Sequence, residues 1–80
     1  MRKFRYRPRI VNACPVVKFL FEEMIAQRMT EADLAEKIGI SRDTIRNWRT
    51  RYNPKVTDLD AALKPLGYKL RAVKIYERRS

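Results

Sequence analysis

The chain has 80 residues, which is enough for one domain with a small hydrophobic core. It carries 19 lysine and arginine residues against 9 acidic residues, and the net charge of +10 favours binding to polyanions such as nucleic acids. One cysteine and no histidine exclude an internal disulfide and argue against a zinc site, and no apolar run approaches the ~20 residues of a membrane-spanning helix.

Residues 1–11 form a basic N-terminal arm, since five of the first ten residues are lysine or arginine. A disordered arm would contact DNA phosphates or enter the minor groove. An edge strand would instead show Phe4 and Tyr6 on one face and arginines on the other, with Pro8 confining it to the edge of a sheet. A frayed terminus is an equally good interpretation.

Residues 12–27 are predicted to form the first helix. Asn12 or Cys14 is its expected N-cap, and Pro15 suits the first turn, where a missing N–H costs nothing. Apolar residues recur three and four apart from Val16 onward, which indicates a helix that its neighbours largely cover. Cys14 is interpreted as a packing residue.

Two short helices joined by a tight turn are predicted between residues 30 and 51. Thr30 is a good N-cap, and Asp33 can reach back to it in a variant of the capping box. Gly39 ends the first of these helices, because glycine reaches the left-handed conformation without a penalty. This arrangement is typical of a helix-turn-helix.

The second of these helices, which Ser41 caps, has only two apolar residues, Ile45 and Trp48, on a single face. Its other positions are polar and include Arg42, Asp43, Arg46, Asn47, Arg49 and Thr50. Such a helix suits the major groove of DNA, where arginine can pair with guanine and asparagine with adenine. The alternative is an ordinary amphipathic helix whose charged face is solvated.

A loop follows the second helix, because Asn53-Pro54 is typical of a turn and proline stops a helix. Arg51, Tyr52, Asn53 and Lys55 lie there. Basic and polar side chains in this place could hold DNA phosphates without reading sequence. The alternative is a loop that is only soluble.

Residues 57–67 are predicted to form a fourth helix with Thr57 as its N-cap. Its apolar stripe consists of Leu59, Ala62, Leu63 and Leu66. Pro65 predicts that the helix ends near Lys64 or has a distorted last turn, and Gly67 stops it.

Residues 68–76 partly alternate basic and apolar side chains and are rich in strand formers, so we predict a β-strand. A lone strand leaves backbone groups unpaired. It therefore needs a partner, either the N-terminal arm or the same strand of a second chain. Residues 77–80 are a tail.

The segment from the first helix to Leu70 resembles the Xre/Cro-type helix-turn-helix regulators, which include phage repressors and the antitoxins of toxin–antitoxin operons. The matching residues are Leu34, Ala35, Gly39, Ile40, Ser41, Arg42, Thr44, Ile45, Trp48, Asn53, Pro54, Leu66 and Gly67. The resemblance implies a mainly α, four-helix lambda-repressor-like domain over residues 12–67, followed by the C-terminal strand.

The resemblance also implies roles on DNA. The residues expected to read bases are Arg42, Asp43, Arg46 and Asn47. The residues expected to contact the DNA backbone are Ser41, Thr44, Arg49, Arg51, Tyr52, Asn53 and Lys55. Glu31 stands where the family has a phosphate-binding glutamine, and a carboxylate cannot donate to phosphate. The family often has an Arg–Glu ion pair between its first helix and the end of the recognition helix. Met24 and Arg49 stand at those places, so both halves are absent together and Arg49 is expected to be free for phosphate.

We therefore predict a sequence-specific regulator that binds double-stranded DNA, and we expect a repressor that binds a two-fold site as a homodimer through its C-terminal strand. A prokaryotic or phage-encoded cytoplasmic protein is expected, without cofactor or metal. No paired-carboxylate, Ser/His or glycine-loop constellation indicates an enzyme. The alternatives are an antitoxin that also holds a toxin protein, a nonspecific architectural or RNA-binding protein, and a phage accessory module.

Overall fold

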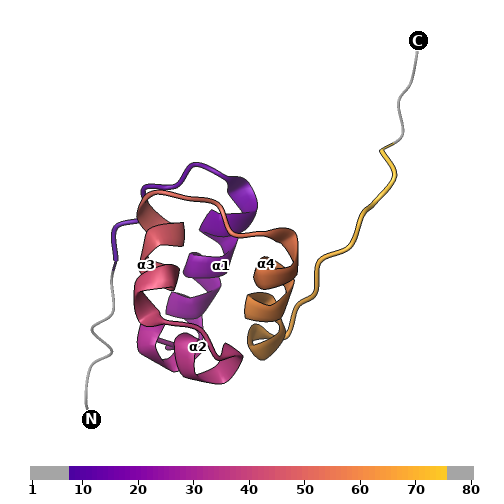
Figure 1. The fold of residues 1–80 in the computed structure, drawn as a ribbon. Helices are drawn as coiled ribbons and strands as arrows, with labels where there is room; N and C mark the ends of the chain where they lie inside the picture. Colours follow the sequence, from indigo (N-terminus) through magenta and orange to yellow (C-terminus); the bar gives the residue numbers. More distant parts are fainter. Residues whose placement is uncertain (1–7, 76–80) are drawn as a thin grey trace.

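A computed structural model describes residues 8–75 of the chain, and this part is helical (Figure 1). Its elements are α1 (Pro15–Ala26), α2 (Glu31–Ile38), α3 (Arg42–Thr50), α4 (Val56–Leu63) and a 3₁₀ turn, η1 (Lys64–Leu66). α1 packs against both α3 and α4, and α2 lies across one end of the group. The predicted mainly helical fold with four helices is confirmed.

The turn between α2 and α3 follows the local sequence signals. The Asp33 backbone N–H donates to Thr30 Oγ1 at 3.1 Å, and the Thr30 backbone N–H donates to Asp33 Oδ2 at 3.0 Å, so the capping box is complete. Gly39 has a left-handed φ of 75°. Ser41 Oγ then accepts from the backbone N–H of Thr44 at 3.1 Å and begins α3. The predicted helix-turn-helix is therefore formed.

α4 begins two residues earlier than the sequence indicates. Its N-cap is Lys55, which makes no side-chain cap bond, and the prediction that Thr57 is the cap is wrong. The reason is that Lys55 already has an extended backbone and accepts the first helical bond, from Leu59 N–H at 2.9 Å. The end of α4 agrees with the prediction, since η1 accommodates Pro65 and Gly67 has a left-handed φ of 96°.

The core lies where the four helices meet. Its fully or almost fully buried side chains are Val17, Leu20, Phe21, Met24, Met29, Leu34, Ala35, Ile45, Trp48, Leu59, Ala62, Leu63 and Leu66. Burial of a large apolar side chain contributes about 1.5–3 kcal/mol, so this cluster is the main source of stability. The two apolar residues of α3 belong to it, which fixes the side of α3 that faces solvent.

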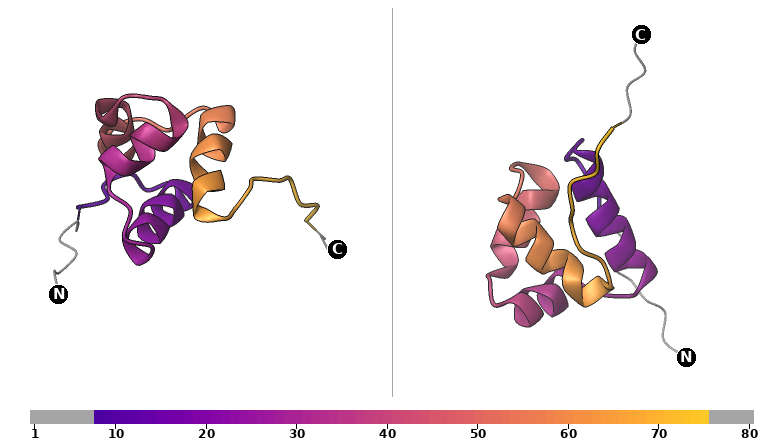
Figure 2. Two further views of the ribbon diagram at one scale, coloured as in Figure 1. Left: turned by 90° about the horizontal axis from the view of Figure 1, so that it is seen from below. Right: turned by 90° about the vertical axis from the view of Figure 1, so that its right-hand side faces the viewer.

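Between η1 and residue 75, the chain contacts the helices through the first residues of this segment. The Leu70 backbone N–H donates to Asp60 Oδ1 at 2.9 Å, and the rings of Phe19 and Tyr68 make an edge-to-face contact with centroids 4.9 Å apart. Beyond these contacts the segment runs away from the helices, as Figure 2 shows.

The predicted C-terminal strand is absent from the described part of the chain, residues 8–75. Residues 68–75 have no regular secondary structure, because no strand among residues 8–75 lies beside them to pair with their backbone groups. Pairing with residues 1–7 of the N-terminal arm lies outside the described residues, as does the end of the predicted strand at residue 76.

Candidate nucleic-acid interface

One side of α3 is buried and the other is open to solvent. Ile45 and Trp48 are inserted into the core with exposed fractions of 0% and 4%. The predicted base-reading residues Arg42, Asp43 and Arg46 are exposed, whereas Asn47 is half-buried. Arg42 and Arg46 are four positions apart on α3, as are Asp43 and Asn47, so the four side chains are neighbours on one surface of the helix.

Asp43 and Arg46 form an ion pair one turn apart on this surface. Arg46 Nη2 lies 3.2 Å from Asp43 Oδ1, and the two side chains are 51% and 79% exposed. A pair this exposed contributes at most about 1 kcal/mol to stability. Its effect is geometric, because it directs the guanidinium of Arg46 while most of its five N–H groups remain available.

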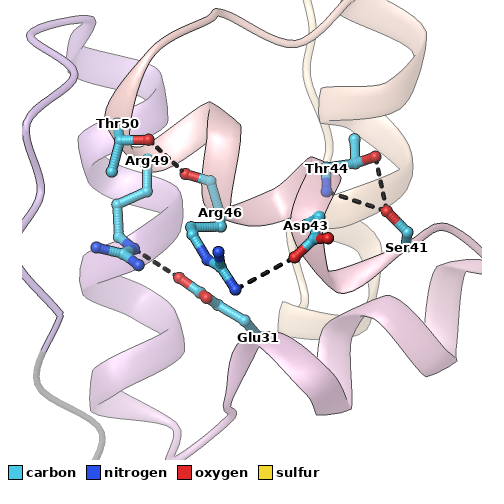
Figure 3. A network of polar contacts seen from close by, with 7 residues as sticks. All are labelled: Glu31, Ser41, Asp43, Thr44, Arg46, Arg49 and Thr50. Atoms are coloured by element: carbon cyan, nitrogen blue, oxygen red, sulfur yellow. Dashed lines mark hydrogen bonds and ion pairs between the residues drawn. The ribbon is translucent and has the colours of Figure 1, made fainter.

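Arg49 is not available for phosphate in the way the sequence predicted. Its Nε donates to Glu31 Oε2 at 2.6 Å (Figure 3). Its Nη1 donates to the backbone carbonyl of Arg9 at 3.0 Å. Glu31 is only 7% exposed, so the ion pair lies largely away from solvent. The prediction of a free Arg49 is therefore wrong, since Glu31 at the start of α2 supplies a carboxylate for its guanidinium.

The sequence contained a signal for this pair. Glu31 stands where the resembling family has a glutamine that faces phosphate, and Met24 and Arg49 stand where it has an Arg–Glu ion pair, both halves of which are absent here. Two departures that leave one unpaired acid and one unpaired base favour a new ion pair between them, because a buried charge requires a partner. The pair forms because the tertiary fold places the start of α2 beside the end of α3.

Asn12 was not predicted to contribute to the interface, yet it holds the segment that follows α3. Its Nδ2 donates to the backbone carbonyls of Trp48 at 2.9 Å and Tyr52 at 3.2 Å, and to Asn53 Oδ1 at 2.8 Å. Its Oδ1 accepts from the backbone N–H of Cys14 at 2.8 Å. These contacts join the start of α1 to the loop after α3, and a separation of about 40 residues hides them from sequence reasoning.

The backbone before α1 also caps α3. The N–H groups of Val11 and Asn12 both donate to the carbonyl of Arg49, at 3.0 and 2.9 Å. The last carbonyls of a helix have no partner within the helix, so these bonds satisfy groups that would otherwise need water. Residues 9–12 and the end of α3 are consequently joined as one unit.

The predicted backbone-contacting residues lie at the two ends of α3. Ser41 and Thr44 are exposed at its beginning, although their hydroxyl groups already contact each other at 2.9 Å. Beyond its last turn the loop exposes Arg51, Tyr52, Asn53 and Lys55. Donors thus flank the predicted base-reading residues along the chain, while the side chain of Arg49 is directed toward α2.

Other kinds of site receive no support from the described residues. Across residues 8–75, no three histidine, cysteine, aspartate or glutamate side chains cluster as metal ligands would. No helix in this part of the chain is long and apolar enough to cross a membrane.

Comparison with known proteins agrees with this geometry. The family model for the homeodomain-like domain matches residues 21–60, which is 40 of the 80 residues. The chain belongs to the homeodomain-like family. The match spans α2 and α3 completely, so the helix-turn-helix of this homeodomain-like domain is of the DNA-binding kind. Searches of curated proteins and of solved structures returned no match.

Proposed function

We propose that this homeodomain-like domain is a sequence-specific, double-stranded DNA-binding regulator that acts as a repressor and not as an enzyme. The observation that carries the proposal is the division of α3 into a buried side, with Ile45 and Trp48, and a charged side open to solvent. A major groove admits a helix of this kind, and the donors of arginine and asparagine can distinguish base pairs there.

Each residue has a separate part in the proposed complex. Arg42, Arg46 and Asn47 read base edges, and Asp43 orients Arg46 through their ion pair. Lys55 and Arg51 neutralise phosphates beyond the end of α3, which fixes the register without reading sequence. Arg49 holds the end of α3 to the start of α2 through its ion pair with Glu31, and it has no direct part in binding phosphate.

We further propose a dimer on a two-fold site, with half-sites about 34 Å apart. A single recognition helix covers only a few base pairs, so a second copy would add both affinity and specificity. The exposed apolar side chains of Val73 and Ile75, at 75% and 82%, support this proposal because a partner chain would cover them.

The test is selection of binding sites from random duplex DNA, followed by measurement of two variants on the selected site. Arg46→Ala should cost about 1–3 kcal/mol on that site and relax the preference at one position. Lys55→Ala should weaken all sequences equally and reduce the salt slope by about 1. Lys64→Ala is the control, since it removes the same charge from η1, where Lys64 pairs with Asp60.

Three results would contradict the proposal. Random selection could return no motif, Arg46→Ala could weaken selected and scrambled duplexes equally, or Lys64→Ala could match Lys55→Ala. Each of these would favour a nonspecific nucleic-acid-binding protein, whose affinity comes from the net charge of +10 alone.

A further inference from the structure

The side-chain amide of Asn12 has a defined orientation. Its Oδ1 is opposite a donor, the backbone N–H of Cys14, and its Nδ2 is opposite three acceptors, the oxygens of Trp48, Tyr52 and Asn53. Exchanging the oxygen and nitrogen would place like groups against each other in all four contacts. The surroundings of Asn12 therefore permit one orientation only.

This orientation determines that of Asn53. Because Asn53 Oδ1 accepts from Asn12 Nδ2 at 2.8 Å, the oxygen side of the Asn53 amide faces the protein. Its Nδ2 must then point the other way, and Asn53 is exposed. Among residues 8–75, no acceptor is found for this NH₂ group, so two donors are presented to solvent at the end of α3.

The neighbourhood of this NH₂ group suits an anion. Arg51, Tyr52 and Lys55 are exposed in the same short loop, and each can donate a hydrogen bond. The loop is also held at its base, since the Arg51 and Tyr52 N–H groups both donate to the carbonyl of Asn47, at 2.7 and 2.8 Å. Residues 51–55 include no acidic side chain that would compete with a bound anion for these donors.

We propose that Asn12 is a positioning residue for DNA: it turns the Asn53 amide so that Asn53 Nδ2 donates to a backbone phosphate next to the end of α3. The inference rests on the proposed DNA-binding function and adds a neutral contact to it. Asn12 itself does not touch DNA, because its own N–H groups are directed at protein oxygens.

The experiment is a double-mutant cycle with Asn12→Ala, Asn53→Ala and the double variant, measured by fluorescence anisotropy on a selected and a scrambled duplex. Each single variant should weaken both duplexes by the same factor, about 3- to 10-fold. The double variant should be no weaker than Asn53→Ala, because Asn12 acts through Asn53. The salt slope should stay unchanged, since both side chains are neutral.

Gln27→Ala is the matched control. Gln27 Nε2 also makes one long-range bond, to the backbone carbonyl of Leu66 at 2.9 Å, but it lies at the other end of α1. Its removal should lower thermal stability and leave DNA affinity as it is. Thermal unfolding of every variant establishes that each is folded at the assay temperature.

Several results would overturn the inference. The losses of Asn12→Ala and Asn53→Ala could multiply in the double variant, Asn12→Ala could weaken the selected duplex alone, or it could bind like the wild type. If one of these results is found and the wild type still binds duplex DNA with a sequence preference, this inference fails and the proposed function stands. If the wild type binds no duplex at low salt, the proposed function fails and this inference fails with it.

NMR on the wild-type protein decides the case if Asn12→Ala does not fold. Adding DNA should shift the side-chain NH₂ resonances of Asn53 strongly and those of Asn12 little, because only the former meet phosphate. Equal shifts, or none at Asn53, would overturn the inference.

Discussion

At the scale of single residues, Glu31 joins two helices through one ion pair. Its carboxylate lies at the beginning of α2, where the helix dipole favours a negative charge, and it accepts from Arg49 Nε at 2.6 Å. Removing two charges from water is costly, and good geometry is needed to offset that cost. The pair therefore holds the start of α2 against the end of α3, and it occupies the Nε–H group of Arg49.

The prediction at this scale concerns stability. Glu31→Ala should lower the free energy of unfolding by about 3 kcal/mol, because it leaves the largely buried guanidinium of Arg49 without its carboxylate. Glu31→Gln should lower it less, since an oxygen remains to accept from Arg49. Urea denaturation measures both, and Glu36→Ala, at an exposed position of the same helix, serves as control. Equal midpoints for Glu31→Ala and Glu36→Ala would contradict the structural role of the pair.

At the scale of elements, α2 depends on its first turn. It has only eight residues, and a helix this short is not stable by itself in water. The capping box of Thr30 and Asp33 satisfies backbone N–H groups that the helix cannot pair internally. The hydrogen bond from the Thr30 backbone N–H to the Asp33 carboxylate lowers the pKa of Asp33 below its usual value.

This lowered pKa predicts a dependence of stability on pH. Because the pKa of Asp33 is lower in the folded chain than in the unfolded one, its stabilising contribution is fully present above the unfolded value of 3.8. It is lost as the pH falls through the folded value. Asp33→Asn should therefore show a shallower loss of stability in acid than the wild type, measured by thermal unfolding from neutral pH downward. Parallel curves would show that the carboxylate does not stabilise α2.

The same element allows a comparison of both halves of the box. Thr30→Ala should cost about 1 kcal/mol at neutral pH, as loss of an N-cap usually does. Asp60, whose pKa is lowered by the bond from the Leu70 backbone N–H, is unchanged in all these variants and contributes equally to each curve.

At the scale of the whole molecule, residues 68–75 lie outside the packed helices and have no regular secondary structure. Leu70 is half-buried against the helices, but the apolar side chains beyond it project into solvent. Figure 2 shows the segment leaving the helices on the side of α4. The exposed Val73 and Ile75 lie on a segment whose backbone groups can pair with the same segment of a second copy, and this pairing is the contact of the proposed dimer.

Sedimentation at micromolar concentration tests this association. The wild type should sediment with twice the monomer mass of 9.6 kDa. Ile75→Asp should shift it toward the monomer without lowering the thermal stability of the helices, because Ile75 is 82% exposed. Lys74→Asp is a control for the added charge. A monomer with and without DNA would contradict the dimer.

The sequence by itself determined the features whose causes are local. Thr30, Gly39 and Ser41 set the limits of α2 and α3 through bonds and dihedral angles within four residues, and the spacing of apolar residues identified the core. The exposed side of α3 followed, because burying Ile45 and Trp48 leaves the opposite side of the helix for Arg42 and Arg46.

Only the tertiary structure decided which distant groups meet. Glu31 and Arg49 are 18 positions apart, and Asn12 reaches Asn53 across 41 positions. The absence of the predicted strand from residues 8–75 also depends on tertiary structure. A strand forms only where a second backbone segment supplies its hydrogen bonds, and residues 8–75 contain no such paired segment. Side-chain pairs and sheet pairs depend on how the helices pack, and no short stretch of sequence contains that information.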